Sequence, residues 1–308
     1  MPDRPAITVA LPTCQGARHL ADALRGVLGQ GGDFDLLVVD DRSTDDTLNV
    51  VAAECGDRAR VLVNPERLGL AGNWNRCVEA SRTPWVAVFH QDDLMLPGHL
   101  DAHRAAIAAT PDAGFVCGGA SVVDESGVEV SPAVVGRGGL GPSDRVFGPG
   151  ELLPHLAVGN PIRCSTATLS RRAHAEAGGF DPSYRYAVDW GYWIKVARAH
   201  PVAWLAAETV AVRWHSASET HRFKCGTLDL EEQEGLMRRL VDELNGGRRM
   251  GADVDRRLSR AYLNRAYDAA GGADRRLRGR CLVRALRLWP GIVGRIVADP
   301  RLAARLLK

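Results

Sequence analysis

The chain has 308 residues, of which 45% are apolar and 25% are charged, and its formal net charge is only +2. This size allows one large α/β domain with a smaller appendage, and the near-neutral charge gives no reason to expect a nucleic acid partner. The charge is unevenly placed, because residues 273–308 contain ten Lys or Arg and two Asp. The rest of the chain is therefore acidic on balance.

The seven cysteines are scattered, and no two of them have the spacing of a Cys-x-x-Cys motif. We therefore expect buried, reduced thiols rather than zinc ligands or disulfides. The first residues show no signal-peptide pattern, and no apolar run approaches the roughly 20 residues that cross a bilayer. The expected location is cytoplasmic, with a peripheral position at the inner face of the membrane as an alternative.

Strand patterns alternate with helix patterns through the first 120 residues. The expected strands are residues 7–11, 34–39, 60–63, 85–89 and 113–117. The expected helices are residues 18–30, a segment capped at 43–45 that runs to 55, and residues 70–81 and 98–109. This alternation predicts an α/β fold with a mixed, mostly parallel sheet and helices on both faces.

The second part of the chain has a different character. We expect a hairpin at 122–130 turning at 124–127, a Gly- and Pro-rich segment at 131–150, strands at 164–170 and 202–212, and helices from 171 and over 188–199. From residue 228 the pattern is helical, with breaks near 246–247, 271–272 and Pro290. The chain therefore divides into residues 1–222 and a helical extension, 223–308.

Polar residues follow three of the expected strands, at Thr13, at Asp40-Asp41 and at His90-Gln91-Asp92-Asp93. Ligands of such sheets bind outside the carboxyl ends of the strands. The adjacent carboxylates of Asp92 and Asp93 repel each other unless a cation lies among them. A divalent metal and a basic side chain are both candidates, and a metal that carries a phosphate is our first hypothesis.

Five separated motifs share an order and spacing that is typical of one family. They are residues 38–45 (VVDDRSTD), 90–93 (HQDD), 178–181 (GGFD), 188–190 (VDW) and 214–215 (WH). Over residues 5–222 the chain resembles the inverting glycosyltransferases of family 2, which have the GT-A fold. The resemblance implies a catalytic domain at 1–222, with a nucleotide-sugar-binding half at 1–120 and an acceptor-binding half at 121–222.

The implied activity is transfer of a sugar from a nucleoside diphosphate donor to an acceptor hydroxyl, by metal-assisted single displacement with inversion. The donor nucleotide is of the UDP, TDP or GDP type, and the acceptor is a glycan, a lipid-linked saccharide or a small molecule. The contacts that choose the sugar and acceptor are expected in residues 131–150 and 215–226. No nucleic acid partner is expected.

The resemblance also implies roles around the donor. Asp41 corresponds to the acid that accepts a hydrogen bond from the nucleobase; the alternative is a helix-entry turn ahead of Ser43. The implied donor-binding residues are Pro12, Thr13, Gln15, Asp41, Arg67, Gly72, Asn73, Asn75, Gln91 and Asp92.

Asp92 matches the last acid of the DXD motif, which binds Mn²⁺ or Mg²⁺ directly. His90 takes the place of the first acid, and imidazole is a poorer ligand for Mg²⁺ than for Mn²⁺. His215 matches a histidine that contacts the metal or the diphosphate. Asp93 is expected to support the loop or hold a metal-bound water, and a plain acidic surface turn is the alternative.

Asp189 matches the general base that deprotonates the acceptor hydroxyl. Val188 and Lys195 replace the acid and the arginine that are usual nearby, and both changes leave the base in place. The alternative for Asp189 is an N-capping residue of its helix. Further residues implied at the acceptor are Asp93, Trp190 and Trp214.

Two other functions fit a nucleotide-binding α/β fold. A nucleotidyltransferase would carry a Gly-rich phosphate loop after the first strand, which residues 12–17 do not offer. A non-catalytic, nucleotide-sugar-binding relic would not need Asp41, Asp92 and Asp189 together. The basic helices of the C-terminal extension would pack on the catalytic domain, form a homodimer or rest on an anionic membrane. Packing is the preferred interpretation, because apolar residues are few and Pro290 interrupts them.

Overall fold

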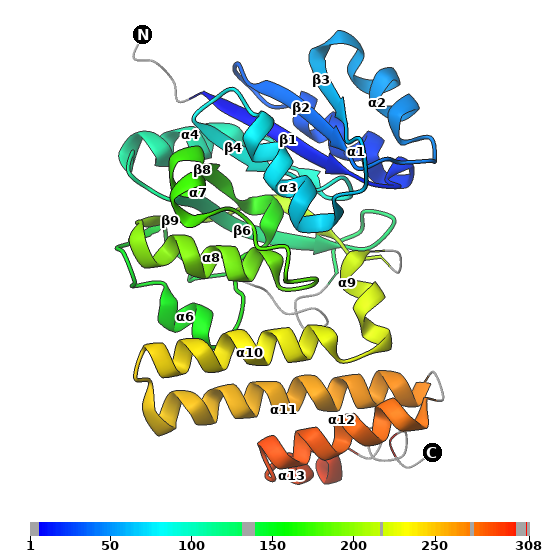
Figure 1. Cartoon of the computed structure of the whole chain (residues 1–308), viewed down its shortest axis with the longest axis vertical. Coiled ribbons are helices and arrows are strands. Elements are labelled where there is room, and N and C mark those ends of the chain that lie inside the picture. Colours follow the sequence, from blue (N-terminus) through cyan, green and yellow to red (C-terminus); the bar gives the residue numbers. More distant parts are fainter. Residues whose placement is uncertain (1–5, 131–138, 216–217, 272–273, 300–305, 307–308) are drawn as a thin grey trace. The chain divides into compact units, whose positions relative to one another are not determined.

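The computed structural model describes residues 6–130, 139–215, 218–271, 274–299 and 306 (Figure 1). They fall into two compact units. Unit 1 lies within Met1–Leu153 and Asn160–His215, and unit 2 lies within Pro154–Gly159 and Ser216–Lys308. The boundary between the units falls after His215, a few residues before the predicted boundary between 222 and 223. Residues 131–138 of the predicted Gly- and Pro-rich segment lie outside the described residues.

Unit 1 is built on one mixed sheet. Its strands are β1 (Ile7–Thr13), β2 (Asp35–Asp40), β3 (Ala59–Val63), β4 (Trp85–Val88), β5 (Leu94–Met95), β6 (Phe115–Val123), β7 (Arg145–Phe147), β8 (Thr168–Ser170) and β9 (Val202–Arg213). They follow the order β3-β2-β1-β4-β8-β6-β9-β5, and β7 pairs with β9. The pairs β1–β2, β1–β4, β2–β3 and β6–β9 are parallel, whereas β5, β7 and β8 run antiparallel to their neighbours. The predicted mixed, mostly parallel sheet is confirmed.

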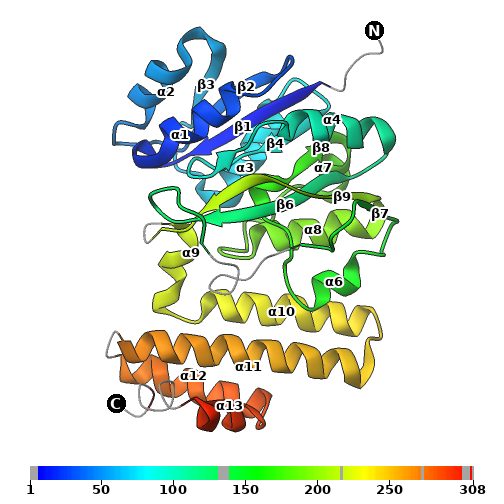
Figure 2. The same cartoon turned by 180° about the vertical axis from the view of Figure 1, so that it is seen from behind.

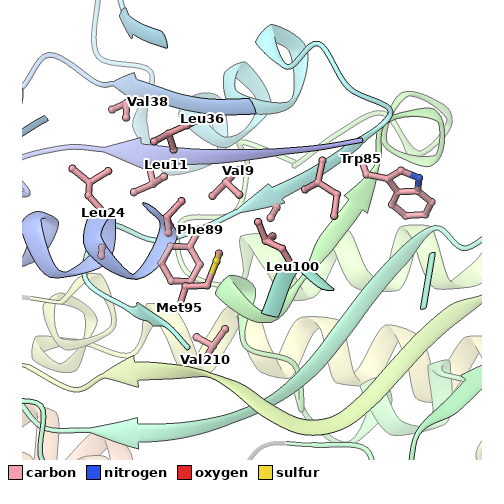
Figure 3. Close-up of a cluster of buried hydrophobic side chains, with 14 of the residues drawn as sticks. Val9, Leu11, Leu24, Leu36, Val38, Trp85, Phe89, Met95, Leu100 and Val210 are labelled. Carbon is pink, nitrogen blue, oxygen red and sulfur yellow. The ribbon is translucent and has the colours of Figure 1, made fainter. Parts of the chain in front are cut away.

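Helices cover both faces of this sheet. On one face, Leu24 of α1 (Ala17–Leu28) and Leu100 of α4 (His99–Ala109) join Val9 and Leu11 of β1 in a buried apolar cluster (Figure 3). On the other face lie α3 (Gly69–Ala80), α7 (Arg171–Ala177) and α8 (Val188–Ala199) (Figures 1 and 2). Because every residue of β1 is buried, the strand is covered from both sides, as its continuous apolar run predicts.

Local polar contacts shift some predicted boundaries. The helix expected from Ser43 is α2 (Thr47–Cys55), which begins later because Ser43 donates its amide and its hydroxyl to Asp40. Asp45 instead accepts bonds from the amide and the hydroxyl of Thr47. The strand expected at 164–170 opens with a 3₁₀ turn, Cys164–Thr166, so only its last residues pair as β8.

Unit 2 is helical. Its elements are α6 (Leu153–Ala157, shared with unit 1), α9 (Glu219–Arg222), a 3₁₀ turn (Phe223–Cys225), α10 (Leu228–Glu243), α11 (Gly247–Gly271), α12 (Arg275–Leu288) and α13 (Ile292–Ala298). The break between α10 and α11 lies near Gly246-Gly247 and the break between α12 and α13 lies near Pro290, as predicted; of the predicted pair 271–272, only Gly271, the last residue of α11, is described. A buried ion pair joins α11 to α10, because Arg265 Nη2 lies 2.6 Å from Asp229 Oδ2 and Nη1 lies 3.0 Å from Oδ1. Among the described residues, none of the helices has both the length and the apolarity that a bilayer crossing requires.

Two histidines of α4 are buried in unit 1, and burial lowers their pKa values. Nδ1 of His99 lies 2.8 Å from Thr209 Oγ1, Nδ1 of His103 lies 2.8 Å from Thr168 Oγ1, and the two ring centroids are 4.1 Å apart. Both side chains are fully buried. Burial lowers the pKa of His99 to about 4. Burial and the neighbouring His99 lower the pKa of His103 well below its usual value.

We expect the free energy of unfolding to fall as the pH drops from about 6.5 to about 4, because the unfolded chain binds protons that the folded chain excludes. At pH 4, His99 alone should lower the free energy of unfolding by about 3 kcal/mol. Urea unfolding followed by tryptophan fluorescence reports mainly on unit 1, which holds six of the seven tryptophans. His99→Gln should flatten the pH dependence, and His155→Gln, at an exposed position, should not. Equal slopes in wild type and His99→Gln would contradict this explanation.

Candidate functional site

The polar residues that follow β1, β2 and β4 meet at one edge of the sheet. The three strands are adjacent and parallel, and Thr13 stands opposite Asp40 in the register. Thr13 Oγ1 donates to Asp40 Oδ1 at 2.9 Å, and both side chains are fully buried. The predicted clustering at the carboxyl ends of the strands is therefore present in the structure.

Asp41 anchors the start of α3. Its Oδ1 accepts bonds from the Asn64 amide at 2.9 Å and the Leu68 N–H at 2.8 Å, and its Oδ2 accepts the Gly69 N–H at 2.9 Å. The N–H groups at a helix N-terminus are unsatisfied within the helix and favour a carboxylate. Asp41 is 3% exposed, so its contacts bind the chain to itself, and its contact with a nucleobase stays a prediction.

The two predicted asparagines of α3 also hold backbone segments. Asn73 is buried, and its amide donates to the Val39 carbonyl at 3.1 Å. Asn75 makes two bonds to Phe180, donating to its carbonyl at 2.8 Å and accepting its N–H at 2.7 Å. Asn75 therefore fixes the turn of the Gly-Gly-Phe-Asp motif against α3, a contact that sequence spacing could not reveal.

Gln91 makes two hydrogen bonds to the backbone of Cys14, the residue that follows β1. Its Oε1 accepts the Cys14 N–H at 2.9 Å and its Nε2 donates to the Cys14 carbonyl at 3.1 Å. A Cβ at Gly16 would stand 2.1 Å from Gln91 Oε1, so a larger residue at this position would displace the Gln91 amide. Gln15 is bonded in turn to Thr44, whose N–H reaches Gln15 Oε1 at 2.6 Å. These amides shape the loops around the predicted donor site.

The other predicted donor residues differ in exposure. Pro12 is buried in β1, whereas Arg67 is exposed. Gly72 lies on α3, where a Cβ would meet the Leu68 Cβ at 2.8 Å. This packing explains the glycine without a ligand, and donor contacts of all three residues stay predictions.

Asp92 is paired with His215. His215 Nε2 lies 2.9 Å from Asp92 Oδ2, although 123 residues separate them in the sequence. Burial by itself raises the pKa of Asp92, but the bond from His215 and the nearby His90 bring it below its usual range. The charged carboxylate is therefore favoured, and this is the form that binds a cation.

Nε2 of His90 and Nδ1 of His215 are buried and have no hydrogen-bond partner within the described residues. One nitrogen or oxygen from each of His90, Asp92 and Asp93 lies within 4.8 Å of the others. Buried polar atoms without partners are costly and often indicate an ion or a water. Imidazole and carboxylate together suit Mn²⁺ better than Mg²⁺.

Asp93 is hydrogen-bonded to residues outside its own loop, and its two predicted roles stay predictions. It is 3% exposed, and it accepts bonds from Ser165 Oγ at 2.5 Å and the Arg213 N–H at 2.9 Å. Burial and the charge of Asp92 raise the pKa of Asp93 to about 7. Both oxygens are already engaged, so the predicted acceptor contact of Asp93 has no support from these bonds.

Asp189 lies in the first turn of α8. Its Oδ1 accepts the Trp190 N–H at 2.7 Å and its Oδ2 accepts the Asn160 amide at 2.9 Å. Burial raises the pKa of Asp189, and the two hydrogen bonds oppose the rise, as do the nearby charges of His90 and Arg163. The N-cap of α8 is Ala187, so capping, the alternative for Asp189, is not its role.

The predicted tryptophans are placed differently. Trp190 is 2% exposed, so its ring is enclosed by protein, whereas Trp214 is 37% exposed. Of the two, Trp214 has the surface that a sugar ring could cover.

Sequence reasoning missed three residues that shape this site. Arg213 is buried at the end of β9 and donates to the Asp92 carbonyl, the Glu125 carbonyl and Asp22 Oδ2, at 3.1, 2.8 and 3.1 Å. Asn160 holds Asp189, and its place in an Asn-Pro pair predicts only a turn. Arg163 lies within electrostatic reach of Asp93 and Asp189, and no sequence signal identifies it.

Comparisons with known proteins address the family directly. The family model described as glycosyl transferase family 2 matches residues 8–174. A protein of Mycobacterium tuberculosis, "Uncharacterized protein MT1568", is 30% identical over 251 residues, which are 79% of this chain and 78% of that protein. The succinoglycan biosynthesis protein ExoO of Rhizobium meliloti is 32% identical over 97 residues, covering 31% of this chain and 28% of ExoO.

Solved structures show the same fold. The structure of residues 1–349 of TarS from S. aureus in complex with UDP-GlcNAc superposes with a TM-score of 0.64 at 15% identity, covering 97% of this chain and 83% of that one. The TarS complex with UDP gives a TM-score of 0.58 at 12% identity, covering 94% and 91%. The fold is therefore GT-A, and since the family model spans more than half of the residues, the chain belongs to glycosyl transferase family 2.

Proposed function

We propose that this glycosyltransferase moves a sugar from a nucleoside diphosphate donor to an acceptor hydroxyl, in one metal-assisted displacement that inverts the anomeric centre. The observation that carries the proposal is the pairing of Asp92 with His215 at the same strand-end edge as Asp41. The structural neighbour TarS was solved with UDP-GlcNAc and with UDP, so UDP is the first donor nucleotide to test. The acceptor class stays open among glycans, lipid-linked saccharides and small molecules.

Asp92 and His215 are the residues that would hold the metal, with His90 as a further ligand. The unpartnered Nε2 of His90, the Nε2 of His215 beside Asp92 and the charged Asp92 carboxylate support a mixed nitrogen and oxygen ligand set. When bound, the metal would neutralise the charge that the diphosphate gains as the sugar leaves.

Asp189 is the proposed general base. Its carboxylate would take the proton of the acceptor hydroxyl while the oxygen bonds to the anomeric carbon and the bond from that carbon to the diphosphate oxygen breaks. Burial raises the pKa of Asp189, which makes it a stronger base than an exposed aspartate. The bonds from Asn160 and the Trp190 N–H would fix the direction of the carboxylate.

Asp189→Asn should lower kcat by about 10²- to 10⁴-fold, because the amide cannot accept the proton. Donor affinity, measured by calorimetric titration with UDP-sugars, should not change. Turnover is measured as release of free nucleoside diphosphate in the presence of acceptor. Asp112→Asn, at an exposed position of the same unit, is the matched control and should keep wild-type kcat. Unchanged turnover in Asp189→Asn would exclude this residue as the base.

The metal assignment predicts that EDTA abolishes transfer and that Mn²⁺ restores it better than Mg²⁺. A donor screen by thermal shift should show a rise in Tm with the matching nucleotide that depends on Mn²⁺, since a ligand of the native state stabilises it. Asp92→Asn should remove the Mn²⁺-dependent part of that rise. Turnover that survives complete chelation would contradict metal assistance, and nucleotide binding without any turnover would favour a binding protein that kept the fold.

The hydrogen bond from Asn160 to Asp189 predicts that substitution of Asn160 changes the pH profile of kcat. Activity should fall at low pH as Asp189 takes up a proton, and removing a donor to its carboxylate raises the pKa of Asp189 further. Asn160→Ala should therefore move the acid limb of kcat to higher pH, and Asn160→Asp should move it further because a second carboxylate would face Asp189. An Asn160→Ala enzyme with reduced kcat but an unmoved acid limb would show that Asn160 does not tune the base.

A further inference from the structure

Helix α12 has two faces of opposite character. Leu277, Cys281 and Ala285 are buried in the apolar core of unit 2, with residues of α11 such as Leu263 and Ala266. The exposed residues of the helix are Arg275, Arg276, Gly279, Arg280, Val283, Arg284, Leu286 and Arg287. The buried face packs α12 against the rest of unit 2. The exposed face is not needed for that packing.

The exposed face is strongly positive. Helix α12 carries six arginines and no acidic residue within Arg275–Leu288. Arg284 pairs with Glu234 at 2.5 Å. Arg276, Arg280 and Arg287 make no ion pair or hydrogen bond through their guanidinium groups with any of the described residues. Their charge is therefore available to an anionic partner.

Exposed apolar side chains are present on α12 and on the next helix, α13. Val283 is 48% exposed and Leu286 is 38% exposed, and on α13 Val293 and Val297 are 48% and 73% exposed. A shallow hollow of about 350 Å³ is lined by Gly279, Arg280, Val283, Arg284 and Arg287. A Cβ at Gly279 would meet no atom within 4 Å, so the hollow is open at this position. The hollow combines guanidinium groups that suit a phosphate with an apolar valine.

We propose that this face of α12, with Arg276, Arg280, Val283, Leu286 and Arg287, docks on an anionic phospholipid surface. A helix that joins basic and apolar side chains on one exposed face suits the boundary between headgroups and acyl chains. The arginines attract the negative surface, and Val283 and Leu286 enter the boundary. A lipid phosphate would occupy the hollow beside Arg280.

Other occupants fit less well. A second copy of the chain would bring the same arginines toward each other across a two-fold interface, and like charges in contact oppose association. A nucleic acid would use the arginines but gain nothing from exposed valines, and the face offers no exposed aromatic ring for stacking.

The test is co-sedimentation of the full chain with vesicles. The chain should sediment with vesicles of equal parts phosphatidylglycerol and phosphatidylcholine, remain in solution with phosphatidylcholine alone, and be released by high salt. Arg280→Glu/Arg287→Glu should weaken binding about tenfold or more, and Val283→Ser should weaken it in both low and moderate salt. An unchanged melting temperature shows that each variant is folded.

The matched control is Arg58→Glu/Arg82→Glu, which makes the same change of net charge at exposed positions of unit 1. It should bind vesicles like wild type. The proposal is overturned if binding is absent, if both double variants lose it equally, or if neutral vesicles bind as well. It is also overturned if Arg280→Glu/Arg287→Glu changes the oligomeric state in sedimentation equilibrium, or the affinity for duplex DNA, while vesicle binding stays the same. None of these outcomes depends on transferase activity.

Discussion

The site depends first on the need to satisfy buried carboxylates at the ends of parallel strands. Asp40 ends the buried strand β2 and Asp41 follows it; both are almost fully covered, so each oxygen needs a donor. Asp40 takes its donors from Thr13 and Ser43, and Asp41 takes its donors from Asn64 and the first N–H groups of α3. These bonds tie β1, β2, β3 and α3 into one edge. The loops that would surround a nucleotide are therefore placed before any ligand arrives.

The same constraint shifts the pKa values of the acids at this site in different directions. Burial raises the pKa of Asp93 and of Asp189, whereas the bond from His215 brings the pKa of Asp92 below its usual range. A charged Asp92 suits the proposed cation, and a more basic Asp189 suits proton transfer. Arg213 bonds to both acids of the loop: its backbone N–H donates to the Asp93 carboxylate, and its guanidinium donates to the backbone carbonyl of Asp92. Asp92 and Asp93 are neighbours in the sequence, yet their surroundings shift their pKa values in opposite directions.

The charged residues of unit 2 include a buried ion pair and a set of exposed arginines on α12. The buried pair of Arg265 with Asp229 links two helices inside the unit, where each charge has its partner. On α12 the arginines outnumber the acids that pair with them: Arg284 pairs with Glu234, whereas Arg276, Arg280 and Arg287 make no ion pair with the described residues. A protein keeps such charge at some cost from self-repulsion, so we connect it with an anionic surface outside the chain.

The sequence by itself determined the alternation of strands and helices, the polar strand ends, the five family motifs and the helical C-terminal extension. It could do so because these features are local: buried strands, helical periodicity and breaks at Gly and Pro are written in short runs of residues. The tertiary structure alone decided that Asn75 and Gln91 hold backbone, that Trp190 is enclosed, and that Asn160 holds Asp189. Only the fold brings His215 to Asp92, because hydrogen bonds between residues far apart in the chain depend on how the strands are ordered in the sheet.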